Sequence, residues 1–272
     1  MGDGYNLTFP KASLTGSEGT AEELSQPDDR NVCDVMYLQA PFLHVEKGLP
    51  DTIPEGLRER ILVARKLATY GFFCYEFHAV SLFWTVSCIE MALKLKFREL
   101  NPGPFRLKRK GKDGAEETCE VFVALLEKRL RERWRIVGMK VKDFDYSFRS
   151  FLAWAFSTKL LPDDLPIPVQ EIVHGFNNRF ALEIFADRAM KEGLIGPNPT
   201  LGDLQRCWNG LSEKQRQHYQ YKPSAVLIEE LPRFRNDMAH PESWNLVLPP
   251  RAPLEGYQLL IDIVARLWSS TA

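Results

Sequence analysis

The spacing of apolar residues predicts helices over most of the chain beyond residue 54. Apolar side chains recur at helical intervals from Pro54 onward, beginning with Leu57, Ile61 and Ala68. The sequence at 69–71 is typical of a break, after which 72 to about 100 is apolar on several faces. A helix with this pattern belongs at the centre of a bundle. The Pro- and Gly-rich sequence at 101–104 predicts where that helix ends.

The middle of the chain has a less regular pattern. The basic segment 106–112 leads into Asp113-Gly114, a turn pair that predicts a small hairpin. Beyond the turn, 117–137 is predicted to be a helix with an apolar side made by Phe122, Leu126, Leu130 and Trp134. Three further helices are expected, separated by Pro-rich stretches, near 147–160, 177–193 and 200–218.

The last third of the chain has the clearest helical spacing. Apolar residues step by three or four positions at Leu227, Leu231, Phe234 and Met238. After a Pro-rich loop the spacing returns at Tyr257, Leu260, Ile261, Val264 and Leu267. Sustained β alternation is absent, so the sequence predicts an all-α helical bundle. The polar residues 1–30 predict a loose N-terminal tail, which leaves 31–272 as a single α-helical domain.

The composition fits a globular protein without membrane segments. Apolar residues make up 44% and charged residues 26% of the 272 positions, and the formal net charge is −1. This balance excludes a uniformly basic nucleic-acid coat but permits a local basic patch. The most apolar uncharged stretch, 77–89, is shorter than the ~20 residues that a membrane-spanning helix needs. The N-terminus also lacks the pattern of a secretory signal, so we expect a cytoplasmic protein.

The cysteines are scattered, odd in number and never spaced as C-x-x-C: Cys33, Cys74, Cys88, Cys119 and Cys207. Such a set predicts neither a disulfide framework nor a zinc site. The chain also lacks a Walker-type phosphate loop and a paired-acid nucleotide site. We therefore expect reduced thiols and no metal or other cofactor.

The segment 231–241 carries the most specific pattern in the chain. It contains Arg235-Asn236, three further residues and then His240, at the end of an apolar stripe. This arrangement resembles the R-N-x-x-x-H signature of the HEPN superfamily. The likeness extends to 88–94, where Glu90 precedes an Ala-Leu pair as in the family's first core helix. It extends also to 253–268, which resembles the helix that closes the family's bundle.

The resemblance covers 57–100 and 223–268 and implies a helical bundle of HEPN type. On this interpretation 101–222 is a long, mainly helical insertion. The resemblance further implies a metal-independent endoribonuclease with a role in stress, toxin or antiphage responses. RNA is then the expected substrate, and any regulatory or antitoxin partner is a separate chain.

The residue types in the motif suit RNA cleavage by attack of the ribose 2′-hydroxyl. That reaction needs a base, an acid for the leaving oxygen, and positive charge near the phosphoryl oxygens. An ordinary histidine side chain titrates near neutral pH, so the residue type at 240 suits either proton-transfer role, while the planar guanidinium of Arg235 matches phosphate. Asn236 lies four residues before His240 on the same helical face and is placed to orient its imidazole.

The spacing of the motif predicts a homodimer. Residues five apart are about 140° apart around a straight helix, so Arg235 and His240 do not share a face. Pro241 biases His240 away from helical geometry and offers one route to bring the pair together. The other route is a two-fold axis that joins two copies of the motif, which resembles the composite cleft of HEPN dimers.

Structural interpretations of the same residues remain open at this point. Arg235 and His240 also fit a helix C-terminus, where a cationic His meets the helix dipole. Glu90 either braces Arg235 across the bundle, as the resemblance implies, or forms a surface pair with Lys94. A chain of this kind would be a non-catalytic module for dimerisation or partner binding.

Two runs of basic residues are candidates for binding the RNA backbone. The first holds Lys108, Arg109 and Lys110, and the second holds Arg129, Arg131, Arg133 and Arg135. Trp134 lies within the second run and is a candidate for stacking on a base. Arg233, two positions before Arg235, adds a further candidate phosphate contact. The alternative is a solvated helix face and loop, as charge runs usually are.

Overall fold

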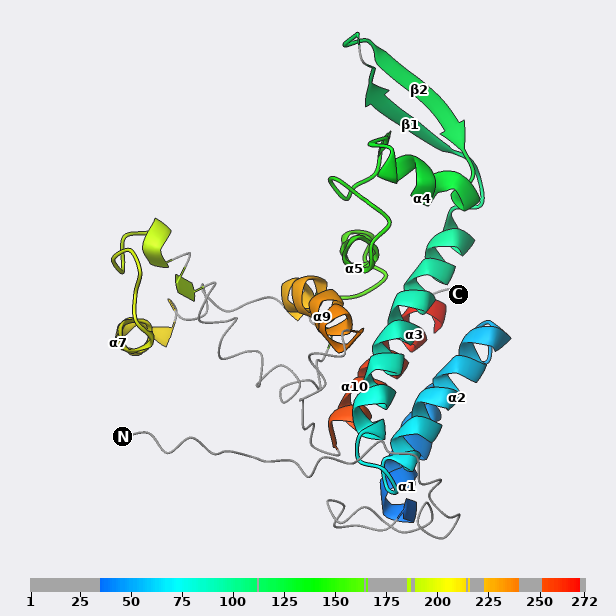
Figure 1. Cartoon of the computed structure of the whole chain (residues 1–272), viewed down its shortest axis with the longest axis vertical. Coiled ribbons are helices and arrows are strands. Elements are labelled where there is room, and N and C mark those ends of the chain that lie inside the picture. Colours follow the sequence, from blue (N-terminus) through cyan, green and yellow to red (C-terminus); the bar gives the residue numbers. More distant parts are fainter. Residues whose placement is uncertain are drawn as a thin grey trace, which may run out of the picture.

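The fold is predominantly helical, with one small antiparallel sheet (Figure 1). The computed structural model describes residues 35–111, 113–163, 165, 185–186, 189–213, 215, 223–239 and 251–269. The prediction of a mainly helical chain is confirmed. The stricter expectation of an all-α architecture is wrong, because the segment that follows the longest helix forms a three-stranded sheet. The expected tail at 1–30 and the motif residue His240 lie outside the described residues.

The longest helix, α3, is the centre of the helical body. It spans Phe77–Leu100 and contacts α2 (Glu55–Tyr70), α5 (Phe148–Ser157), α9 (Pro223–Ala239) and α10 (Arg251–Ser269). A further helix, α1 (Val35–Glu46), packs on α2 and α10. The buried side chains of α3 face several directions, with Leu82, Ile89 and Phe97 almost fully enclosed. The apolar pattern of 72–100 therefore has its predicted consequence, a helix surrounded by others.

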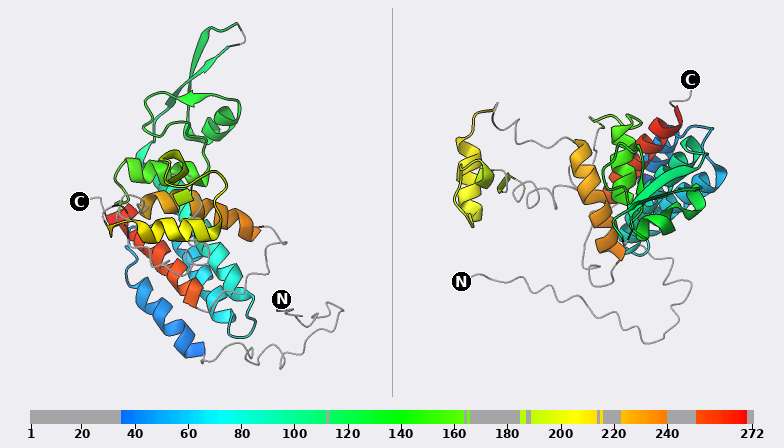
Figure 2. Two further views of the ribbon diagram at one scale, coloured as in Figure 1. Left: turned by 90° about the vertical axis from the view of Figure 1, so that its left-hand side faces the viewer. Right: turned by 90° about the horizontal axis from the view of Figure 1, so that it is seen from above.

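The hairpin predicted at Asp113-Gly114 is present. Strands β1 (Phe105–Lys110) and β2 (Glu116–Val121) pair antiparallel, and β3 (Arg135–Ile136) pairs with the other edge of β1. Gly114 has a φ of +84°, a conformation that a residue with a Cβ rarely adopts, so glycine suits this turn. Figure 2 shows the hairpin projecting beyond the helices at the end where α3 finishes.

The single helix predicted over 117–137 is wrong. Residues from Glu116 to Val121 pair with β1 instead, and the helix α4 is limited to Val123–Arg131. Arg133 then takes a φ of +67°, which reverses the chain and brings 135–136 back to β1 as β3. The helical spacing of Leu126 and Leu130 was real, since both are buried, but it did not extend across Phe122, which is 62% exposed.

A second, smaller hydrophobic core lies apart from the main one. Its buried members are Phe185, Ala186, Ala189, Leu204 and Leu211. Helix α7 (Leu201–Gly210) begins with a capping box, in which Thr200 and Asp203 each bond to the other's backbone N–H. The predicted helix at 200–218 therefore starts where expected, but α7 ends at Gly210, and residues 214 and 216–218 lie outside the described residues. Most of the helix expected at 177–193 lies outside the described residues.

No helix in the described part of the chain is both long enough and apolar enough to cross a membrane.

Candidate functional site

A groove with a cavity volume of about 590 Å³ lies where α3, α4 and α9 meet the segment that leads into α5. Helix α3 contributes Glu90 and Lys94, and α9 contributes its 232–237 segment. Basic side chains come from each of these elements: Lys94, Arg131, Arg149, Arg233 and Arg235. The groove therefore brings the Arg of the R-N-x-x-x-H segment together with cations from distant parts of the sequence.

Glu90 joins the two long helices at the base of this groove. Its carboxylate lies 3.2 Å from an Nη of Arg235 on α9 and 2.7 Å from Nζ of Lys94 one turn further along α3. The Glu90 side chain is only 12% exposed. Both contacts considered from the sequence are thus present, and one mostly buried carboxylate serves two cations. Such a carboxylate would be costly to leave unpaired.

Arg235 is held in one orientation but is not enclosed. Its second Nη donates a hydrogen bond to Oδ1 of Asn236 at 3.1 Å, and its side chain is 37% exposed. The buried Nε has no hydrogen-bond partner among the described residues. The guanidinium is therefore fixed by Glu90 and Asn236 while part of it still faces the groove. Asn236 in this structure contacts Arg235, and its predicted partner His240 is not described.

The loop before α5 forms one wall of the groove. The carboxylate of Asp145 accepts hydrogen bonds from the Ser147 N–H at 3.0 Å and the Ser150 hydroxyl at 2.6 Å. Partial burial raises the pKa of Asp145, but these hydrogen bonds outweigh it and hold the pKa below its ordinary value. Ser147 caps α5 by accepting from the Ser150 N–H. This network sets the direction in which α5 starts, and with it the position of Arg149.

Arg149 is a groove residue that no local sequence pattern indicates. It belongs to no motif, and it enters the site because α5 packs on α9, where Arg149 pairs with Glu229. Arg131 lines the groove from the end of α4 and pairs with Glu127 at 2.5 Å. Arg233 is exposed and forms no ion pair with any residue that the structure describes.

The predicted RNA-binding residues do not form one surface. Arg131 and Arg233 line the groove beside Arg235. A separate groove at the hairpin is lined by Lys108, Arg109, Lys110, Arg133 and Arg135. Arg129 pairs with Glu132 at 2.9 Å and lies 6.0 Å from the ring of Trp134. The second run is divided between the two grooves, because the turn at Arg133 carries the chain away from α4 and pairs Arg135 with β1.

Other reactive groups in the described residues offer no competing site. No group of three or more His, Cys, Asp and Glu residues there could hold a metal ion. Burial raises the pKa of Cys88 to about 12, so its thiol is not activated as a nucleophile. The Glu90–Arg235 groove is therefore the strongest candidate for chemistry in the described structure.

Comparisons with known proteins assign the chain to no family. No protein-family model, curated protein or solved structure matches it. The resemblance to the HEPN superfamily consequently depends on the residues of this chain alone, above all on Arg235, Asn236 and His240, with Glu90 in support.

Proposed function

We propose that the chain is a HEPN-type, metal-independent endoribonuclease whose site is the groove around Arg235. His240 serves as the general acid or base, Arg235 stabilises the charge that develops on the phosphoryl oxygens, and Asn236 orients the imidazole of His240. The substrate's own 2′-hydroxyl is the nucleophile, so the product carries a 2′,3′-cyclic phosphate. The scattered cysteines fit the reducing conditions of the cytoplasm, where we place the protein.

The observation that carries this proposal is the contact between Glu90 and Arg235. A phosphate-stabilising guanidinium has to be aimed before substrate arrives, because donors that are already in place lose little free energy to reorganisation. Glu90, 12% exposed and 3.2 Å from Arg235, supplies such a constraint from the neighbouring helix. The HEPN resemblance assigns the same relation to the acidic residue of the first core helix and the Arg of the motif.

The charges around Arg235 support a phosphate-containing substrate. Lys94, Arg131, Arg149 and Arg233 line the same groove. The pairs Arg131–Glu127 and Arg149–Glu229 lie at exposed positions, where water and salt screen the attraction and each pair contributes little stability. These guanidinium groups can therefore exchange a carboxylate for a phosphate with a small change in free energy.

The second candidate is a non-catalytic module that binds a partner or dimerises through α9. The observation in its favour is that Glu90 and Asn236 already occupy both Nη atoms of Arg235 within one chain. If those contacts persist in the presence of RNA, Arg235 is a structural residue that joins α3 to α9.

The decisive experiment is an RNA-cleavage assay in EDTA. We expect the wild-type chain to cut, and Arg235→Ala and His240→Ala each to slow cutting by about 10²–10³-fold, the usual loss for a positioned donor or acid–base group. Arg235→Lys should recover only part of the rate, because Lys lacks the planar fork. Replacement of the scissile 2′-hydroxyl by 2′-deoxy should abolish the reaction.

The matched control is Lys66→Ala, which removes an exposed cation from α2 and should leave the rate unchanged. Absence of cutting by the wild-type chain, or equal cutting of the 2′-deoxy substrate, would rule out the proposed mechanism. An Arg235→Ala chain that cuts normally but melts at a lower temperature would favour the structural module.

The proposal includes a homodimer in which α9 and its neighbours form the contact. The expectation comes from the 140° separation of Arg235 and His240 on an ideal helix. Light scattering of the wild-type chain at micromolar concentration should give twice the monomer mass. A monomer mass under these conditions would contradict the composite-site version of the proposal.

A further inference from the structure

The hairpin has one face that is basic along its whole first strand. Side chains alternate between the two faces of a strand, and in β1 the exposed positions are Arg106, Lys108 and Lys110. The positions between them, Phe105 and Leu107, are buried against the body of the protein. The three cations therefore project from the same side of the sheet, away from the core.

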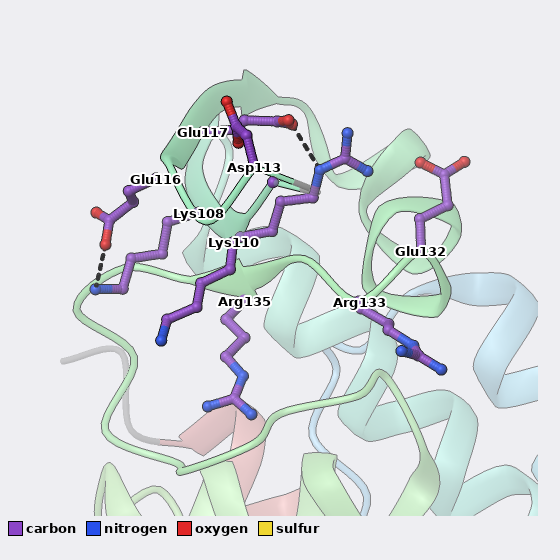
Figure 3. A pocket seen from close by; sticks show the side chains of 10 residues that line it. Lys108, Lys110, Asp113, Glu116, Glu117, Glu132, Arg133 and Arg135 are labelled. Atoms are coloured by element: carbon purple, nitrogen blue, oxygen red, sulfur yellow. Dashed lines mark hydrogen bonds and ion pairs between the residues drawn. The ribbon is translucent and has the colours of Figure 1, made fainter.

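The pairing of strands extends this basic face sideways. Arg135 of β3 is the direct cross-strand partner of Lys108, so both side chains lie on the same face. Figure 3 shows Lys110 and Arg135 extending in the same direction and Glu116 reaching Lys108, while Asp113 and Glu117 point away. Lys108, Lys110 and Arg135 of this face line a groove with a cavity volume of about 1080 Å³, which Arg109 also borders and Arg106 does not. The exposed face thus carries four cations on adjacent strands: Arg106, Lys108, Lys110 and Arg135. It also carries two carboxylates of β2, because Glu120 and Glu116 are the cross-strand partners of Arg106 and Lys110. The cations outnumber these carboxylates, so the face keeps an excess of positive charge.

Most of the charge on this face is available. Lys108 lies 3.6 Å from Glu116, and Arg135 lies 3.4 Å from Asp143, with every side chain of the two pairs between 48% and 72% exposed. Pairs at this exposure are screened by water and are worth little. Arg106 and Lys110 form no ion pair with any described residue. The cations of this face therefore contribute little to the stability of the fold.

On the opposite face of the hairpin, the cation Arg109 makes structural contacts. Arg109 lies 4.5 Å from the centre of the Trp134 ring and pairs with Glu117 at 2.7 Å. Trp134 itself is only 7% exposed, so the expectation that it stacks on a base is wrong. Arg109 and Trp134 belong to the attachment of the hairpin, and no base-stacking aromatic ring lines the groove within the described residues.

We propose that the exposed face of the hairpin is a second binding site, which takes the phosphate backbone of a single RNA strand. Alternate residues of a strand are roughly 6.8 Å apart, which spaces Arg106, Lys108 and Lys110 as a regular row of positive charges. Contacts of this kind position a nucleic acid without reading its sequence. The site is distinct from the groove at Arg235, and its occupation does not require that the chain cleaves RNA.

Binding by charge alone has a measurable signature in its salt dependence. For a single strand, the logarithm of the association constant falls with the logarithm of salt concentration with a slope of about −0.7 per phosphate contact. The full set of four cations should therefore contribute about −3 to the slope. Loss of two should weaken binding roughly tenfold at low salt and flatten the slope by about 1.4.

The experiment measures fluorescence anisotropy of a labelled 2′-O-methyl RNA oligonucleotide, which lacks the nucleophile for cleavage. It compares the full wild-type chain with Arg106→Gln/Lys110→Gln over a salt series. The matched control is Lys47→Gln/Lys66→Gln, which removes the same number of exposed cations from the helical body. The hairpin variant should lose affinity and slope, and the control variant should retain both.

Equal affinity and equal slope for the hairpin variant and the wild type would overturn the proposal, whatever the outcome of the cleavage assay. So would binding of the wild type to vesicles that contain phosphatidylserine, lost in the hairpin variant, together with no binding to the RNA. Thermal melting of each variant checks that both folds are intact. If the hairpin variant melts early, Lys110→Gln alone, at an exposed position with no described partner, provides the same comparison.

Discussion

Both grooves are lined by cations and carboxylates, but they differ in how those charges are held. In the groove around Arg235, the central carboxylate of Glu90 is 12% exposed and joins two helices. At the hairpin, the carboxylates of Glu116 and Glu117 are 61% and 44% exposed and join neighbouring strands. A buried pair fixes the direction of a guanidinium, whereas an exposed pair leaves it free to exchange partners.

This difference in burial distinguishes a groove suited to catalysis from one suited to binding, although the basic residues of both look alike in the sequence. Directed charge suits a reaction centre, where a donor has to meet one atom of the substrate. Exchangeable charge suits retention of a long polyanion, where many weak contacts add up. The proposed division of labour, with chemistry at Arg235 and backbone binding at the hairpin, follows from burial and not from the number of basic residues.

The largest expected effect comes from a charge placed among the buried apolar residues of α9. Met238 is 2% exposed in the stripe that seats α9, so Met238→Asp should cost more than about 4 kcal/mol of stability and unfold the chain. The same change on the exposed hairpin face, Thr118→Asp, should stay within about 0.5 kcal/mol. Thermal melting followed by circular dichroism distinguishes the two. A folded Met238→Asp chain would contradict the packing described for α9.

The helical body was predictable from sequence because long apolar repeats leave few alternatives. The stripes at 57–100 and 227–267 each need a partner surface, and α2, α3, α9 and α10 supply it to one another. The sheet was only half predictable. The turn at Asp113-Gly114 marked a hairpin, but Glu116–Val121 has no strong strand pattern and becomes β2 by pairing with β1. Helix α1, with Pro41 in its interior, lies outside the predicted elements.

The candidate site divides in the same way. Arg235, Asn236 and Glu90 were selected from sequence because they lie in recognisable local patterns. Arg149 was not, since it reaches the groove only through the packing of α5 on α9. The basic runs were recognised as charged, but their division between two grooves depends on the strand register and on the turn at Arg133. Such tertiary placement has no local signal.

Neutralising one carboxylate in each groove tests the difference in burial directly. Glu90→Gln removes the negative charge between Lys94 and Arg235, and we expect a loss of about 2 kcal/mol, moderated because Arg235 is 37% exposed. Glu117→Gln, at 44% exposure, should cost less than about 1 kcal/mol. Urea denaturation of both variants gives the two values. Equal losses would mean that the pair at Glu90 is no more constrained than the pair at the hairpin.

The wall of the first groove should respond to acid. Because the folded-state pKa of Asp145 is lowered from 3.8, its carboxylate stabilises the fold above that pH, and this contribution is lost as the pH falls. Wild type should therefore lose more of its melting temperature than Asp145→Asn between about pH 5 and about pH 3. In free energy of unfolding, the difference between the two chains should be less than about 1 kcal/mol, since Asp145 is exposed. Parallel melting curves for the two chains over this range would show that the Ser147 and Ser150 contacts contribute nothing.

The smallest effect tests which face of the hairpin binds RNA. Arg109→Gln removes the cation above the Trp134 ring and the ion pair with Glu117. Because the side chains of Arg109 and Glu117 are both partly exposed, the loss in folding stability should be about 0.5–1 kcal/mol. RNA affinity and its salt slope should nevertheless match the wild type, because Arg109 lies on the face opposite Arg106 and Lys110. Since Arg109 lies between two of the proposed contacts in the sequence, the comparison separates strand geometry from local charge density. A loss of affinity equal to that of the Arg106→Gln/Lys110→Gln variant would mean that net charge, and not the alternation of β1, governs binding.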